Sequence, residues 1–348
     1  MEQRTRAGIA AVSIGLIFLL VQLGALALVE PFKDAGLQAT ENPQNAGNSV
    51  AYIAALLVMT GFMLLAFKYD LDVVIRGFIV LTGGYIGFIV LSAIVPSSIL
   101  PVAGASSLAW AAAAAIVIGL VVHPEWYVID AAGIVMGAGA AGLFGISFGI
   151  LPALVLLSAL AVYDAISVYG TEHMLTLAEG VMDLRVPVVL VVPLSLSYSF
   201  LDAGTPASVA EDESNAEESV ATDDEESDGE RPDDQKPDGE EADDEPDPLD
   251  REALFIGLGD AVIPTVLVAS AAFFAPETVP TFAVPGIALP LTAATAMVGT
   301  FLGLAMLLRM VLKGRAHAGL PLLNGGAIGG YLVGALASGL TLVQALGL

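Results

Sequence analysis

The chain has 348 residues, of which 56% are hydrophobic and 14% are charged, and its mean hydropathy is +0.80. This composition lies outside the range of soluble globular domains and is typical of proteins with many membrane spans. The absence of cysteine excludes disulfides, thiolate metal sites and a cysteine nucleophile.

The formal net charge of −25 comes mainly from one segment of the chain. Residues 202–252 contain 23 acidic residues against three basic ones, which gives −20 and leaves −5 for the rest. Because this segment has almost no apolar residues, it cannot bury a core, and we expect it to be disordered. An acidic loop does not attract a polyanion, so we expect no nucleic acid partner.

Apolar stretches of about 20 residues, the length that crosses a bilayer, predict nine transmembrane helices. They are expected at residues 8–29, 49–67, 77–95, 102–122, 127–147, 150–170, 253–275, 286–309 and 319–343. The first stretch is longer than the apolar core of a signal peptide, which favours an uncleaved helix. The sequence therefore predicts an all-α, multi-pass integral membrane protein of the cell membrane, with the lipid bilayer as its surroundings.

The basic residues predict how the chain is oriented. With a cytoplasmic N-terminus, eleven of the twelve Lys and Arg residues fall on the cytoplasmic side, and only Lys33 falls outside. Nine spans then place the C-terminus outside. The chain divides into helices one to six in residues 1–170, a cytoplasmic loop in residues 171–252, and helices seven to nine in residues 253–348.

One part of the cytoplasmic loop differs from its acidic remainder. Residues 187–193 are β-branched and apolar and are bounded by prolines. Because β-branched residues favour strands and proline disfavours a helix interior, this pattern predicts an extended segment.

Two aspartates, Asp164 and Asp260, lie inside the sixth and seventh predicted spans. A carboxylate costs roughly 2.5 to 3.5 kcal/mol at the centre of a membrane helix, so it is retained mainly where it faces a partner or a water-filled cavity. Counted along ideal helices, both aspartates lie about 9 to 11 Å from the cytoplasmic helix ends. Two carboxylates brought together would share a proton and could activate water for attack on a peptide bond.

The residues next to the aspartates favour a water-accessible site. Gly257 and Gly259 remove side chains just before the second aspartate and allow close backbone approach. Pro264, four residues after that aspartate, is expected to kink the helix. Tyr163 precedes the first aspartate and could orient its carboxylate or contact substrate; an ordinary interfacial tyrosine is the alternative.

Three short motifs together resemble those of the presenilin and signal peptide peptidase family of intramembrane aspartyl proteases, in particular its archaeal members. They are Tyr163-Asp164, Gly257-Leu258-Gly259-Asp260 and Leu320-Pro321. The family's third motif is Pro-Ala-Leu, whereas this chain has Ala318-Gly319-Leu320, so only the leucine and the proline after it match. The predicted spans, orientation and long loop also resemble those of the family.

The resemblance implies that Asp164 and Asp260 are a catalytic dyad. It also implies that six neighbouring residues shape the site or bind substrate: Tyr163, Gly257, Leu258, Gly259, Leu320 and Pro321. The implied reaction is hydrolysis of peptide bonds within transmembrane segments or signal peptides, with no metal and no organic cofactor. A homo-oligomer is possible. By the same analogy, residues 187–193 could pair with an unwound substrate by β-strand addition.

Other functions are compatible with parts of the sequence. A proton- or ion-coupled transporter could use the same intramembrane acid pair, and a prepilin-type peptidase also has a Gly-x-Gly-Asp motif, although nine spans fit that family poorly. Residues 145–149 match G-x-S-x-G but lie at the outer end of a predicted span rather than after a strand. No H-E-x-x-H motif occurs, so a zinc protease is unsupported.

Overall fold

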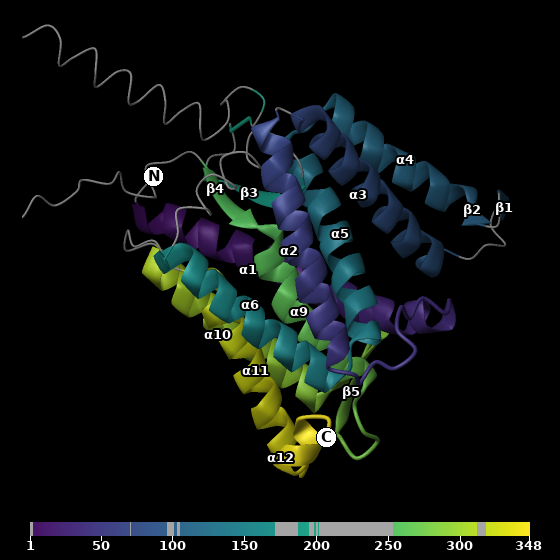
Figure 1. Ribbon diagram of the computed structural model, residues 1–348, viewed down its shortest axis with the longest axis vertical. Coiled ribbons are helices and arrows are strands. Elements are labelled where there is room, and N and C mark those ends of the chain that lie inside the picture. Colours follow the sequence, from purple (N-terminus) through teal and green to yellow (C-terminus); the bar gives the residue numbers. More distant parts are fainter. Residues whose placement is uncertain are drawn as a thin grey trace, which may run out of the picture.

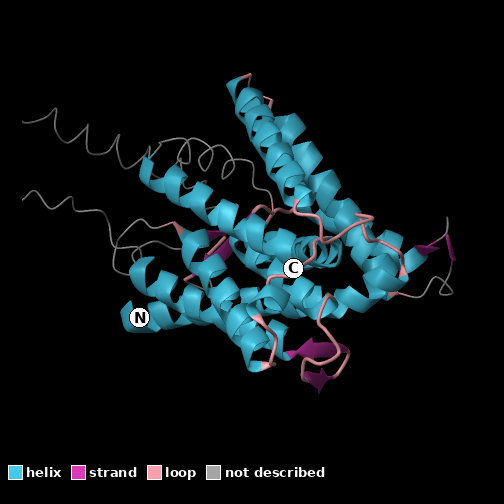
Figure 2. Cartoon of the chain, turned by 60° about the horizontal axis from the view of Figure 1, so that its bottom comes forward, coloured by secondary structure: helices cyan, strands magenta, loops and turns pink. Residues whose placement is uncertain are grey.

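The structure is a computed structural model that describes residues 3–69, 71–95, 101–102, 105–170, 187–194, 198–199, 201, 253–311 and 318–348. The acidic segment predicted to be disordered lies outside these residues. Helices dominate the described chain (Figures 1 and 2). The helices are α1 (Gln3–Asp34), α2 (Gly47–Lys68), α3 (Asp72–Ile94), α4 (Ser107–Val122), α5 (Trp126–Ser147), α6 (Ile150–Gly170), α9 (Leu258–Phe273), α10 (Leu291–Val311), α11 (Gly319–Ala337) and the short α12 (Leu342–Ala345).

Seven of the described helices are long and apolar enough to cross a membrane: α1, α2, α3, α5, α6, α10 and α11. The apolar helices α4 and α9 are shorter, with 16 residues each. The prediction of a helical membrane protein with several spans is therefore confirmed.

Three antiparallel pairs of short strands accompany the helices of this all-α fold. They are β1 (Pro101–Val102) with β2 (Ala105–Ser106), β3 (Val189–Pro193) with β4 (Ala253–Gly257), and β5 (Thr281–Val284) with β6 (Ile287–Pro290). The extended segment predicted at residues 187–193 is confirmed as β3.

The strands shorten three of the predicted helices. Residues 253–257 were expected to begin the seventh helix but form β4, because β3 offers their backbone groups hydrogen-bond partners. Residues 286–290 were expected to begin the eighth helix, but Gly286 has φ +76° and turns the chain between β5 and β6. The expected fourth helix begins at Ser107, after β2. The expected ninth helix ends at Ala337, shortly before Gly339 with φ +83°.

Helix α5 forms the centre of the molecule, where it packs against α1, α3 and α9. Thirteen of its residues are buried, and many of them are Gly or Ala, which lets neighbouring backbones come close. At Gly145, for example, an added Cβ would overlap the Cβ of Ala269 on α9. Helix α2, by contrast, has large apolar side chains exposed along much of its length, as expected for a surface in contact with lipid.

Helices α10 and α11 form the closest pair and lie side by side in Figure 1 (yellow). Glycines face one another across this contact: a Cβ on Gly299 would overlap the carbonyl oxygen of Gly326, and a Cβ on Gly303 would overlap that of Leu322. Small residues four apart permit such close backbone packing between membrane helices. The beginning of α11 is thereby held firmly against α10.

Candidate active site

The two aspartates lie on different helices and meet at the beginning of a third. Asp164 lies in α6, two turns from its end, and its side chain is buried. Asp260 is the third residue of α9. The expectation that Asp260 lies about 9 to 11 Å from the beginning of its helix was therefore wrong, because β4 occupies the residues before α9. The expectation that the two carboxylates come together does not depend on that count.

The first two residues of α11 bring the carboxylates together. The backbone N–H of Leu320 donates a hydrogen bond of 3.0 Å to Oδ2 of Asp164. A Cβ placed on Gly319 would lie 3.5 Å from Oδ1 of Asp260. Because Gly319 and Leu320 are consecutive, both carboxylates lie against the same short piece of backbone.

Glycines surround Asp260 on two sides. Gly257 is the N-cap of α9, and a Cβ on it would lie 3.6 Å from Oδ2 of Asp260. Gly319 lies on the other side. A Cβ on Gly259 would meet nothing within 4 Å, so the close backbone approach expected at this residue is absent. The glycines instead leave space around a carboxylate that is only partly buried.

The other residues expected at the site have different surroundings. Tyr163 is 42% exposed, on the outside of α6. The N–H of Leu258 donates a 2.7 Å hydrogen bond to the carbonyl of Val188. Leu320 packs against a buried apolar cluster that includes Leu160. Pro321 follows as the third residue of α11, where the absence of an N–H does not interrupt the helix.

Asn324, a completely buried polar residue of α11, was not among the site residues predicted from the sequence. Its Nδ2 donates a 2.9 Å hydrogen bond to the carbonyl of Leu157 on α6. This bond joins the same two helices as the hydrogen bond between Leu320 and Asp164, one helical turn further along α11. A polar residue inside an apolar span, four positions after Leu320, was the signal that could have identified it.

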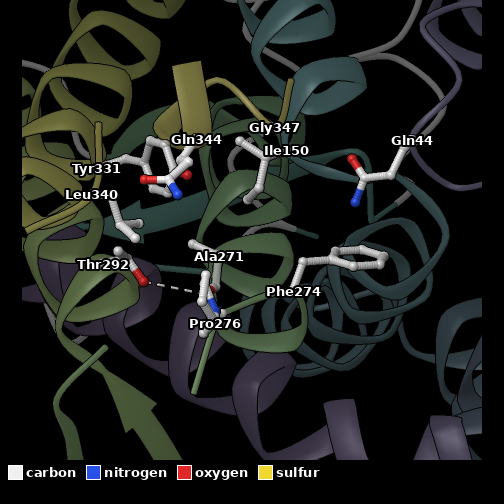
Figure 3. Close-up of a pocket in the computed structure, with 11 residues that line it drawn as sticks. Gln44, Ile150, Ala271, Phe274, Pro276, Thr292, Tyr331, Leu340, Gln344 and Gly347 are labelled. Atoms are coloured by element: carbon white, nitrogen blue, oxygen red, sulfur yellow. Dashed lines mark hydrogen bonds between the residues drawn. The ribbon is translucent and has the colours of Figure 1, made fainter. Parts of the chain in front are cut away.

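Two further features lie away from this site. Ser147 of the G-x-S-x-G match accepts the N–H of Ala39 at the end of α5, so its hydroxyl has a structural contact. A small hollow lies further along α9, at Ala271, which is about 16 Å along the helix from Asp260. The lining contains no acid and no histidine (Figure 3), and its polar side chains are Gln44, Thr292, Tyr331 and Gln344.

No three acidic or histidine side chains gather closely enough to hold a metal ion within the described residues. The groups available for chemistry at the beginning of α11 are the two carboxylates and the backbone beside them. Paired carboxylates of this kind can divide acid and base roles between them.

The family model described as signal-peptide peptidase, presenilin aspartyl protease matches residues 15–340. The chain belongs to this family. The protein is therefore an intramembrane aspartyl protease, and its several apolar helices make it a multi-pass membrane protein. The transport function that the acid pair alone left open finds no support in these matches.

Solved structures of a presenilin family intramembrane aspartate protease are similar to the chain. The structure in space group C222 is 32% identical, with a TM-score of 0.59, and the match covers 94% of this chain and 99% of that one. The structure in space group P2 is 33% identical, with a TM-score of 0.57 and coverage of 93% and 97%. The comparison with curated proteins gives no match.

Proposed function

We propose that Asp164 and Asp260 are the catalytic dyad of this protease. The observation that carries the proposal is the meeting of both carboxylates at Gly319 and Leu320. An ionised carboxylate takes a proton from water as the water attacks the peptide carbonyl, and a protonated carboxyl donates a hydrogen bond to the carbonyl oxygen. The protonated carboxyl can then supply the proton that the leaving amine needs.

The substrates that we propose are transmembrane segments and signal peptides. Such a segment enters the bilayer as a helix whose peptide bonds are protected, so it must unwind near the dyad before it can be cleaved. The β3–β4 pair lies immediately before Asp260 (Figure 1, where β4 leads into α9), and an unwound substrate could add to it as a further strand. One edge of β3 is already occupied, because the N–H of Val191 donates to Asp130. We therefore propose that the substrate pairs along β4.

Deletion of residues 187–193 tests this proposal. Without β3, the strand beside Asp260 loses its partner, so we expect cleavage to fall below detection while the helices still insert into the membrane. Cleavage products measured by mass spectrometry, together with protease protection of the inserted protein, separate the two effects. Cleavage at more than about one tenth of the wild-type rate would contradict a role for the β3–β4 pair in substrate binding.

We also propose that all nine long helices of the described chain cross the membrane, with the N-terminus in the cytoplasm and the C-terminus outside. The apolar composition of α4 and α9 supports their inclusion despite their shorter length. The distribution of Lys and Arg supports the orientation. A homo-oligomer stays a prediction, which sedimentation of the purified protein in detergent would test.

The experiment that tests the proposed function is cleavage of a single-span substrate reconstituted with the purified protein in vesicles. Mass spectrometry of the products should find cuts inside the apolar segment of the substrate. Products cut only in the flanking polar residues would contradict intramembrane cleavage by this dyad.

Leu320→Pro should lower the cleavage rate by about ten- to a hundredfold. The change removes the N–H that Asp164 accepts, and a hydrogen bond to a charged group contributes about 1.5 to 3 kcal/mol. Position 320 lies in the first turn of α11, where proline is tolerated, so the helix itself should persist. Leu320→Ala keeps the N–H and is the matched control. Equal losses in the two variants would show that the leucine side chain, rather than the hydrogen bond, is required.

A further inference from the structure

Asp130, a buried acid of α5 outside the dyad, accepts a hydrogen bond from Val191 of β3, the strand paired with the one that leads into Asp260. We propose that Asp130 of α5 is a positioning residue for the reaction: by holding β3 through the Val191 N–H, it sets the position of β4 and hence of Asp260. This inference rests on the proposed role of Asp260 in catalysis.

The contact itself is short and buried. Oδ1 of Asp130 accepts the N–H of Val191 at 2.8 Å, and the residue is 8% exposed. An acid inside an apolar helix is costly unless a partner compensates for it. Here the partner is a backbone donor from a segment 61 residues further along the chain, so the acid joins two distant parts of the sequence.

The geometry of the strands shows what this hydrogen bond adds. Residues in an antiparallel pair alternate between those that exchange hydrogen bonds with the opposite strand and those whose backbone groups point away. Val191 points away from β4, because its N–H reaches α5. Asp130 therefore fixes β3 from the edge opposite β4 and leaves the hydrogen bonds between the strands intact.

The position of β3 determines that of Asp260, because β4, which pairs with β3, leads directly into α9. Val189 is paired with Gly257, and the N–H of Leu258 donates to the carbonyl of Val188. Gly257 is the N-cap of α9, so the last residue of β4 is also the point where the helix of Asp260 begins. A displacement of β3 must therefore displace the first turn of α9.

The same face of α5 contacts both ends of this connection. Asp130, Gly133 and Gly137 lie on one face of the helix, spaced by three and four residues. A Cβ on Gly133 would lie 2.9 Å from Cδ2 of Leu190, and a Cβ on Gly137 would lie 3.1 Å from Cδ1 of Leu258. The glycines let β3 and α9 approach α5 closely. Asp130 provides the polar contact that fixes the position of β3 along α5.

A second acid, Glu125 at the N-cap of α5, holds the chain just after β3. Oε1 of Glu125 accepts the hydroxyl of Ser199 at 2.6 Å. Tyr198 is buried in the same apolar cluster as Val191 and Ala253, the first residue of β4. Helix α5 and its N-cap residue thus hold this segment at two points, and Asp130 is the residue that contacts the strand itself.

The test compares three changes of the contact in the full-length reconstituted protein. Asp130→Leu removes the acceptor, Val191→Pro removes the donor, and Asp130→Asn keeps an oxygen that can accept. Proline at Val191 removes only an N–H that points away from β4, so the strand pair should persist. The matched control is Ala131→Leu, on an exposed position of α5. The measurements are kcat, KM and the distribution of cleavage positions.

We expect Asp130→Leu and Val191→Pro each to lower kcat at least tenfold, with cuts spread over more positions. Asp130→Asn should stay within about threefold of the wild type, and the double variant should be no worse than either single change, because both remove the same interaction. Additive effects, or a loss in Asp130→Asn equal to that in Asp130→Leu, would overturn the proposal.

Hydrogen exchange of the β3 amides provides a readout that does not depend on activity. Asp130→Leu should speed exchange at Val191 at least tenfold, whereas Asp130→Asn should leave it protected. Unchanged exchange in Asp130→Leu would overturn the proposed contact. Absence of cleavage by the wild-type protein would count against the proposed dyad instead, and the exchange result would still decide the role of Asp130.

Discussion

Asp164→Asn and Asp260→Asn should each reduce cleavage of a reconstituted single-span substrate at least about a thousandfold. A positioned acid or base contributes about 10² to 10⁴ to the rate of such a reaction, and in the proposed mechanism each aspartate makes one of the two proton transfers. Asparagine has nearly the same size and keeps an acceptor oxygen for the Leu320 N–H, so the site should stay assembled while the chemistry is lost. Mass spectrometry of the products gives the rate and the cut positions together.

The matched control for both changes is Asp72→Asn. Asp72 lies in the first turn of α3, outside the α6, α9 and α11 contact that forms the site, and this change should leave the rate nearly unaltered. Cleavage by either dyad variant at more than about one tenth of the wild-type rate, at the same positions, would contradict the assignment. Loss in the control as well would show that the assay reports on folding rather than on catalysis.

Gly326→Val should have the largest effect on stability, because its new side chain would enter the backbone of α10. A Cβ at this position would overlap the carbonyl oxygen of Gly299, and backbone cannot move aside as a flexible side chain does. Overpacking typically costs about 1 to 3 kcal/mol, and valine at such a contact should reach the upper end. We expect the midpoint of thermal unfolding in detergent to fall by roughly 10 °C.

The same change should also reduce cleavage at temperatures where the protein remains folded. Separation of α11 from α10 moves the beginning of α11, and with it the Leu320 N–H that Asp164 accepts. Gly325→Val is a closely matched control, because the neighbouring position is exposed and a Cβ there meets nothing within 4 Å. Similar destabilisation by both substitutions would indicate an effect of the β-branched side chain on α11 itself rather than a clash between helices.

Sequence patterns predicted the features that depend on local composition. The apolar stretches identified the regions of the long helices, and the β-branched residues between Pro187 and Pro193 identified β3. The acid pair was identified because a carboxylate inside an apolar span is costly. Each of these signals lies within one short stretch of the chain.

The features that the sequence did not predict depend on contacts between distant segments. The apolar residues 253–257 are compatible with a membrane helix, and only the presence of β3, about 60 residues earlier, makes them a strand. Nothing in the sequence around Asp130 indicates that Val191 lies beside it. In the same way, the role of Asn324 depends on its hydrogen bond to the carbonyl of Leu157 on another helix, which the sequence does not indicate.

The incomplete third motif shows that a residue that departs from a family's sequence pattern can still lie at the site. Gly319 occupies a position where the family's motif has alanine, so the motif match does not include this residue. In the structure, however, it lies beside Asp260, with space for a Cβ at ordinary contact distance from the carboxylate. The position is thus compatible with either small residue, and the backbone of the motif makes the contact with Asp164.

The short length of α9 has a consequence for how its two ends are surrounded. Its 16 residues span only about 24 Å, whereas the hydrocarbon core of a bilayer is about 30 Å thick. Helices α1, α5, α6, α10 and α11 pack around α9, so protein rather than lipid lies beside it. Among residues 257–273 only Gly257 and Gly259 are exposed, so the side of α9 open to an approaching molecule is the end that carries Asp260.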